Sequence, residues 1–171
     1  FKELGGIHYR TDYDLSKHQE GSKERMEVSF EDEKLIPHVL ELSFGVDRNI
    51  WALMDIFHEK NERAVLRVPP SLAPYSAGIF PLVNKDGLDA RAKDIYLMLK
   101  EGLNVYYDDS GSIGRRYARM DEIGTPFCIT VDYESKEKGT VTVRERDSTL
   151  QKRVAISELE PVLRELLSGK R

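Results

Sequence analysis

Cysteine is almost absent from this sequence, and so are long apolar runs and closely spaced histidines. The single cysteine, Cys128, excludes an internal disulfide framework and a zinc site built from several cysteines. Its neighbours in PFCITV predict a buried, unreactive position on a strand, in a reducing, cytoplasmic compartment. No apolar stretch approaches the ~18 residues of a membrane-spanning helix, so we predict no membrane partner.

Two further absences concern metal binding and the start of the chain. Its four histidines do not form a close ligand pair such as HxxxH, so we predict no zinc. The sequence begins at Phe1 without an initiator methionine or a signal-peptide pattern, which suggests that it is cut from a longer chain. The histidines are His8, His18, His38 and His58.

Charged residues make up 33% and hydrophobic residues 40% of the 171 positions, and the net charge is -4. This balance predicts a folded protein with a heavily charged surface, long enough for one domain and part of another. An acidic total argues against a non-specific nucleic-acid binder. A local basic patch can still direct an encounter with RNA.

The first sixty residues are predicted to be polar and turn-rich before they become apolar. Ile50, Leu53, Met54 and Phe57 recur at helical spacing, which predicts a helix between Gly45 and Glu59. Trp51 is predicted to pack with them. The charged HEKNER segment that follows is interpreted as a connector, so we place a domain boundary between residues 62 and 63.

Residues 63–171 alternate between apolar strands and amphipathic helices. The pattern predicts an α/β domain with a mixed sheet of about five strands flanked by helices. Pro81 suggests an edge or irregular position for the strand at 78–83, and the charged ESKEKG turn predicts an antiparallel hairpin. Expected strands cover 64–68, 78–83, 103–107, 126–133, 140–147 and 151–156; expected helices run from Leu88 to Gly102, from Ile113 to Gly124, and onward from a cap at Ser157.

The stretch DDSGSIGRRYARMDEIG places Arg115, Arg116 and Arg119 behind a glycine-serine turn. Free backbone N–H groups at a helix start, together with arginines four residues apart, can bracket a phosphate or a base edge. Alternatively, the helix is merely solvated and neighbouring acids neutralise its arginines. Those acids are Asp108, Asp109, Asp121 and Glu122, and secondary candidates for phosphate contacts are Arg144, Arg146, Lys152 and Arg153.

A second polar combination lies at Glu41-Leu42-Ser43-Phe44-Gly45, followed by Arg48. A carboxylate and a hydroxyl can hold an ammonium group, while an arginine can hold or stack on a nucleotide. From the residues alone, a core strand that runs into an amphipathic helix is an equally open interpretation.

Several motif strings resemble the glycyl-tRNA synthetase family of class II aminoacyl-tRNA synthetases. LELSFGVDRNIWALMD is similar to motif 3 of that family, and KELGGIHYRTDYDL resembles the segment before it. The match is strongest to the archaeal and eukaryotic type, and it implies the end of a class II catalytic domain (1–62) followed by an anticodon-binding domain (63–171). The strings APYSAGIFPLVNKDGL, YYDDSGSIGRRYARMDEIGTPFCITVDYE and TVTVRERDSTLQKRVAISEL resemble that second domain.

The resemblance implies roles residue by residue. Three residues match the glycine site, although Leu42 stands where many relatives carry proline. Three match the ATP site, and the carboxylate of Glu3 is implied to help hold Mg²⁺. The implied glycine residues are Glu41, Leu42 and Ser43, the ATP residues are Glu3, Leu4 and Arg48, and the tRNA residues are Arg115, Arg116 and Arg119.

The implied function is that of a homodimeric enzyme that activates glycine with ATP and charges tRNA(Gly). We find no motif 1 and no motif 2 in the 171 residues, and we assign no catalytic side chain, so the chain is expected to be inactive by itself. An alternative is a non-enzymatic RNA-binding module derived from such a synthetase.

Overall fold

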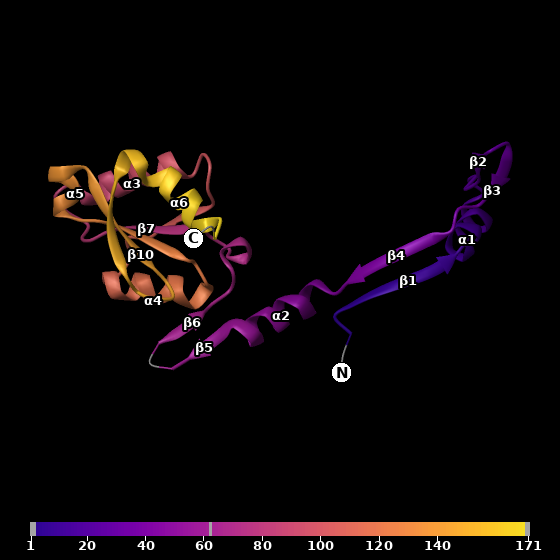
Figure 1. The fold of residues 1–171 in the computed structure, drawn as a ribbon, viewed down its shortest axis with the longest axis horizontal. Coiled ribbons are helices and arrows are strands. Elements are labelled where there is room, and N and C mark those ends of the chain that lie inside the picture. Colours follow the sequence, from indigo (N-terminus) through magenta and orange to yellow (C-terminus); the bar gives the residue numbers. More distant parts are fainter. Residues whose placement is uncertain (1–2, 62, 170–171) are drawn as a thin grey trace. The chain divides into compact units, whose positions relative to one another are not determined.

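The computed structural model describes residues 3–61 and 63–169, and it divides into two units, Phe1–Leu53 and Met54–Arg171. Figure 1 shows the elements of both units along the chain. The division falls inside helix α2 (Val46–Phe57), upstream of the predicted domain boundary. That predicted boundary involves Glu62, which lies outside the described residues.

The first unit is built around a two-stranded antiparallel ribbon of β1 (Gly5–Thr11) and β4 (Val39–Phe44). Between them lie helix α1 (Tyr13–Ser22) and a hairpin of β2 (Val28–Phe30) and β3 (Glu33–Leu35). The segment predicted as polar and turn-rich thus contains a helix and a hairpin that the sequence analysis did not predict. The hairpin forms because Glu31 and Asp32 both adopt positive φ, as a two-residue turn of this kind requires.

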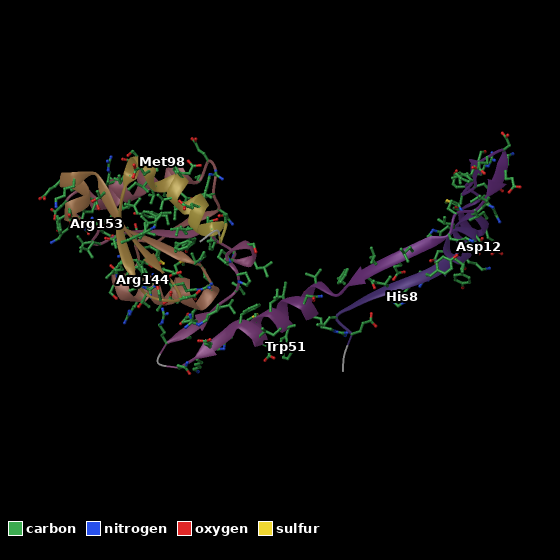
Figure 2. The ribbon with its side chains drawn as sticks, viewed as in Figure 1. His8, Asp12, Trp51, Met98, Arg144 and Arg153 are labelled. Atoms are coloured by element: carbon green, nitrogen blue, oxygen red, sulfur yellow. The ribbon has the colours of Figure 1, made fainter. Side chains whose placement is uncertain are left out.

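Helix α2 confirms the helix predicted between Gly45 and Glu59. Trp51, however, is 68% exposed within this chain, so its predicted packing is not made here (Figure 2). The HEKNER segment interpreted as a connector contains β5 (His58–Lys60), which pairs with β6 (Ala64–Leu66) as an antiparallel hairpin. An ion pair between Arg67 and Glu59, at 2.7 Å, ties the two sides of this hairpin together.

The second unit contains a five-stranded mixed sheet, which confirms the predicted fold class. The strand order is β11-β10-β9-β7-β8. Strand β7 runs parallel to both of its neighbours, while β9, β10 and β11 are antiparallel in succession. The strands span Ala77–Pro81 (β7), Val105–Tyr107 (β8), Phe127–Val131 (β9), Thr140–Glu145 (β10) and Gln151–Ala155 (β11).

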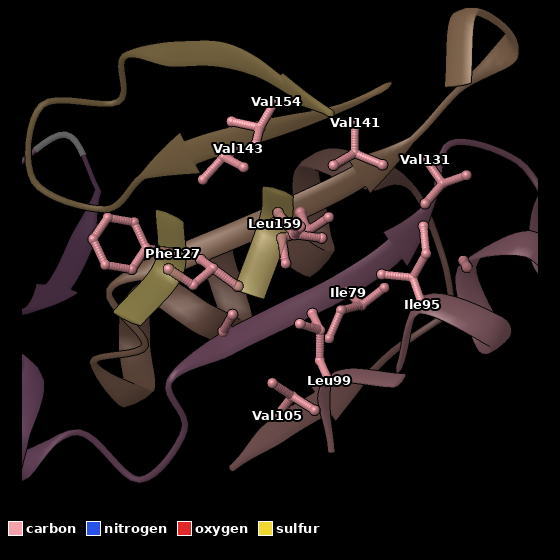
Figure 3. Close-up of a cluster of buried hydrophobic side chains, with 14 of the residues drawn as sticks. Ile79, Ile95, Leu99, Val105, Phe127, Val131, Val141, Val143, Val154 and Leu159 are labelled. Atoms are coloured by element: carbon pink, nitrogen blue, oxygen red, sulfur yellow. The ribbon is translucent and has the colours of Figure 1, made fainter. Parts of the chain in front are cut away.

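Helices cover both faces of this sheet (Figure 1). Helices α3 (Leu88–Leu99) and α6 (Leu159–Leu167) contribute to the larger core with the sheet, shown in Figure 3. Helix α4 (Ile113–Ile123) packs on the opposite face, where Met120 contacts Phe80 and Cys128. Within the described residues, no helix is both long and apolar enough to cross a membrane.

Three local predictions in this unit were wrong for identifiable reasons. Pro81 ends an internal strand, which tolerates proline because the β8 register stops at Ile79 and leaves no β8 residue opposite it. The strands on either side of ESKEKG, β9 and β10, do pair antiparallel as predicted, but the predicted turn between them is a short helix, α5 (Tyr133–Lys138), whose start is capped reciprocally by Asp132 and Ser135. Ser157 does not cap α6, because it lies inside a 3₁₀ turn (Ile156–Glu158).

The cysteine prediction is confirmed. Cys128 is buried on β9, and loss of hydration raises the pKa of its thiol to about 12.

Candidate functional site

The ribbon of the first unit separates polar from apolar side chains. Residues paired across antiparallel strands point to the same face, so Glu41 opposite His8 shares a face with Ser43 opposite Gly6. Leu42 points to the other face, where it pairs with Ile7 and is 63% exposed. The structure therefore brings two of the three predicted glycine-binding residues onto one face, with the side chain of the third on the opposite face.

Glu41 has a cationic neighbour that the sequence did not indicate. The Nε atom of Arg10 lies 3.4 Å from its carboxylate. Arg10 also binds both carboxylate oxygens of Asp14, and this hydrogen bonding holds the pKa of Asp14 below its ordinary value. The alternation of Ile7 and Tyr9 with polar positions in β1 is the signal that could have placed Arg10 beside Glu41.

The predicted ATP residues surround one open hollow of about 510 Å³ at the junction of β4 and α2. Arg48 donates a hydrogen bond to the Glu3 carbonyl, and Asn49 donates to the Leu4 carbonyl at 3.0 Å. The hydroxyl-bearing Ser43 also lines the hollow, whereas Glu41 does not. Glu3, Leu4 and Arg48, distant in sequence, are thus brought together.

The Glu3 side chain can be tested as a magnesium ligand. Among the described residues, no group of three or more histidine, cysteine or acidic side chains could hold a metal ion. Mg²⁺ bound to a nucleotide needs only one or two carboxylates, because phosphate oxygens and water complete its shell. Two carboxylates line this hollow, those of Glu3 and Asp47, which fits magnesium carried by a nucleotide.

Arg116 of the predicted tRNA-binding cluster lies inside the domain, with only 2% of its surface exposed. Its guanidinium donates to four backbone carbonyls: Pro81, Asp109 at 2.9 Å, Ser110 at 3.3 Å and Gly111 at 2.7 Å. These bonds fix the loop that precedes α4 against the end of β7. The Arg116 side chain therefore has an interior, loop-shaping position.

Arg119 fixes the same loop from outside. It donates to the carboxylate of Asp108 through Nε at 2.9 Å and to the Ser110 carbonyl at 2.8 Å. Burial alone would raise the pKa of Asp108, but hydrogen bonds from Ser110 and Arg119 lower it below its ordinary value. Arg119 is thus partly neutralised, as the alternative interpretation of the cluster predicted.

Arg115 differs from both, because its side chain is exposed on the outer face of α4. Within residues 3–61 and 63–169 its guanidinium makes no hydrogen bond and no ion pair. Of the three predicted tRNA-binding arginines, Arg115 is therefore the one whose whole guanidinium is available to an anion.

Two secondary candidates are also buried. Arg144 forms a two-pronged ion pair with Asp121, both bonds 3.0 Å long, and lies 4.8 Å from the centre of the Tyr117 ring. Arg146 is 3% exposed and donates to the carbonyls of Val68 and Gly124. Both hold the fold together. Of the remaining candidates, Arg153 pairs with Asp132 and Glu134, and Lys152 is exposed.

Sequence reasoning missed a pair of tyrosines at the edge of the sheet. The ring centres of Tyr75 and Tyr106 lie 5.0 Å apart, beside Arg119. Both tyrosines lie in the family-like strings, but those strings are 31 residues apart at these positions, and the spacing gave no sign that the two rings meet; the fold brings them together.

Comparison with known proteins identifies both parts of the chain. The family described as anticodon binding domain matches residues 76–166. The glycine–tRNA ligase of Borreliella burgdorferi is 46% identical over 169 residues, and that of Thermobifida fusca is 44% identical over 181 residues. These matches cover 93% and 98% of this chain, but the chain spans only 38% and 39% of those relatives.

A solved structure resembles the fold over almost its whole length. Prolyl-tRNA synthetase from Cryptosporidium parvum, crystallised with L-proline and AMP, matches with a TM-score of 0.70 and 24% identity. The match covers 97% of this chain and 35% of that one, and at this identity it supports the fold alone.

Proposed function

Because the chain belongs to the anticodon binding domain family, we propose that it is the tRNA-recognising part of a glycine–tRNA ligase, together with one wall of its glycine and ATP site. The observation that carries this proposal is the 46% identity to a glycine–tRNA ligase, maintained across 93% of the chain. It extends over both units, so it supports the ribbon and hollow as well as the anticodon-binding fold.

In the proposed reaction, the first unit holds the small substrates. The carboxylate of Glu41 and the hydroxyl of Ser43, on one face of β4, would accept hydrogen bonds from the glycine ammonium group. Leu42 would shape the strand from the opposite face without touching the ammonium group. Arg10, whose Nε atom lies 3.4 Å from the Glu41 carboxylate, would hold that carboxylate in position.

The hollow beside this face would receive ATP. Arg48 would contact the nucleotide as a fixed cation, and Glu3 with Leu4 would form the opposite wall. Magnesium bound with ATP would offset the phosphate charge, with Glu3 as a protein carboxylate that helps to hold it. The work of these residues is to position substrates, since no covalent nucleophile is needed.

The second unit would recognise tRNA(Gly) through the outer face of α4. Arg115 is the proposed phosphate contact, while Arg119 and Arg116 hold the loop from which α4 starts. The full enzyme is proposed to be a cytoplasmic homodimer.

A binding titration tests the proposal. The 171-residue chain is titrated against a labelled tRNA(Gly) transcript, and against transcripts with altered anticodon bases, at one stated salt concentration. We expect tRNA(Gly) to bind at least about tenfold more tightly, which corresponds to ~1.4 kcal/mol. Equal, salt-labile binding of all transcripts would contradict anticodon recognition by this chain.

A separate measurement distinguishes the enzyme from an RNA-binding module that has lost its substrate site. The chain is titrated with a non-hydrolysable glycyl-adenylate analogue by calorimetry. Binding that is lost in Arg48→Ala supports the substrate wall. Absence of any binding, with tRNA binding intact, would favour the module.

A further inference from the structure

The tyrosine pair belongs to a hollow of about 420 Å³ on the second unit, which we call the tyrosine hollow. It forms where the loop before β7, the edge strand β8 and the C-terminal half of α4 meet. Its residues are Pro74, Tyr75, Tyr106, Arg119, Met120, Glu122 and Ile123.

The walls of the tyrosine hollow suit a flat aromatic ligand. Tyr75 and Tyr106 are tilted by 41° to each other, and Tyr106 is 39% exposed on the edge strand. Met120, 2% exposed, closes the hollow from below. Within the described residues, neither tyrosine hydroxyl makes a hydrogen bond, so both can still donate to a ligand. Exposed ring faces beside an apolar floor are what nucleic-acid bases stack upon.

Charges around the tyrosine hollow are ordered along one face of α4. Arg115, Arg119 and Glu122 follow one another at spacings of four and three residues, so they share that face. Arg119 keeps its Nη1 group unbonded within the described residues, because Asp108 and Ser110 occupy only Nε and Nη2. The phosphates of a bound polynucleotide would therefore lie near the two arginines, toward the start of α4. A base edge would lie near the carboxylate of Glu122, farther along the helix.

We propose that the tyrosine hollow binds one unstacked RNA base that carries an exocyclic amino group. The base stacks on Tyr106 and Tyr75, its amino group donates to Glu122, and the adjoining phosphate lies between Arg119 and Arg115. Uracil has no amino group and would leave Glu122 without a donor, so the tyrosine hollow discriminates against it. This inference rests on the proposed tRNA-binding function and assigns that function to particular side chains.

Replacement of the ring tests the stacking. Tyr106→Leu keeps apolar bulk without an aromatic face, and we expect it to weaken binding of the tRNA(Gly) transcript about tenfold. Tyr106→Phe keeps the ring and should stay within about twofold of the unchanged chain. The matched control is Tyr133→Leu, an exposed tyrosine on α5 that belongs to no part of the tyrosine hollow.

Salt dependence separates stacking from charge. Tyr106→Leu should leave the slope of log affinity against log salt unchanged, while Arg115→Met should reduce it by about 0.7. If Tyr106→Leu merely unfolded the protein, both the affinity and its salt dependence would fall. Circular dichroism would detect such a loss of fold.

The preference for cytidine over uridine tests the role proposed for Glu122. The unchanged chain should bind a cytidine hexanucleotide more tightly than a uridine hexanucleotide, and Glu122→Gln should shrink that ratio. Equal binding of both, or equal losses in Tyr106→Leu and Tyr133→Leu, would overturn the tyrosine hollow while tRNA binding by the unchanged chain still stood. No tRNA binding by the unchanged chain would instead overturn the proposed function.

Discussion

Arg115 and Arg116 are adjacent in sequence, yet the structure predicts opposite consequences for their replacement. Arg116→Met removes a buried guanidinium that donates to four carbonyls of the loop before α4 and the end of β7. Arg115→Met removes an exposed cation without a hydrogen bond or ion pair in the described part of the chain. The pair therefore forms its own matched control.

The expected loss in Arg116→Met follows from the carbonyls left behind. Two of the four keep another side-chain donor, since Asn84 donates to the Asp109 carbonyl and Arg119 to that of Ser110. The other two, the carbonyls of Pro81 and Gly111, lose the charged donor and keep no other side-chain donor within the described residues. Because each such hydrogen bond contributes about 1.5–3 kcal/mol and water can replace part of it, we expect a loss of about 3 kcal/mol. For Arg115→Met the expected change is within about 0.5 kcal/mol.

Urea denaturation followed by circular dichroism measures both variants. With a slope of about 2 kcal/mol per molar urea, Arg116→Met should lower the midpoint of the second unit by about 1.5 M. The midpoint of Arg115→Met should stay within about 0.3 M of the unchanged chain. In tRNA titrations at low urea concentration, Arg115→Met should be the variant with the larger effect. It weakens tRNA binding while it leaves the fold intact.

Equal midpoints for the two variants would refute the assignment of Arg116 to the interior. Equal tRNA affinity of Arg115→Met and the unchanged chain would refute the assignment of Arg115 as the phosphate contact.

Three further predictions concern single groups of the second unit. Asp108→Asn should destabilise the fold by about 1–3 kcal/mol near neutral pH. Folding lowers the pKa of Asp108, so the stabilisation that its carboxylate provides is fully present above the unfolded pKa of about 4. This stabilisation is lost as the pH falls through the folded pKa. The stabilities of the variant and the unchanged chain should therefore converge in acid. Cys128, whose thiol pKa is raised to about 12, should react with a disulfide reagent only at the rate of unfolding; rapid reaction in the native state would contradict its burial. Gly124→Ala should lower the thermal midpoint by several degrees, because φ is +86° and a Cβ would lie 3.0 Å from the Leu66 carbonyl oxygen; an unchanged midpoint would contradict this.

Sequence periodicity was sufficient where a helix or strand buries one face. Leu88, Ala92, Ile95 and Leu99, the expected inner face of α3, are all buried, and Gly124 ends α4 in the left-handed conformation expected of a C-terminal glycine. These features depend on local spacing and on one backbone conformation, which the residues themselves specify.

The first unit was harder to predict because its elements bury little. Helix α1 has no buried residue, so no apolar stripe marks it. The ribbon did leave a signal in the alternation of Leu40, Leu42 and Phe44 with Glu41 and Ser43, which predicts a strand by its period of two. The interpretation of these residues as a strand that runs into an amphipathic helix is confirmed by β4 and α2, although β4 is half exposed and does not lie in a core.

The three arginines show what sequence cannot supply. Their spacing identified a cationic segment, but the acids that surround them are distributed by the fold. Asp108 binds Arg119, whereas Asp121 is buried against Arg144 and Arg63 instead of neutralising α4. A chain with a net charge of -4 can therefore keep an exposed arginine on the outer face of this helix, because two of the neighbouring carboxylates, Asp108 and Asp121, are already held by other cations. Since two of the three arginines fix the loop, the third projects from a helix start whose backbone is already held, so a phosphate bound there would order the Arg115 side chain without also ordering the loop.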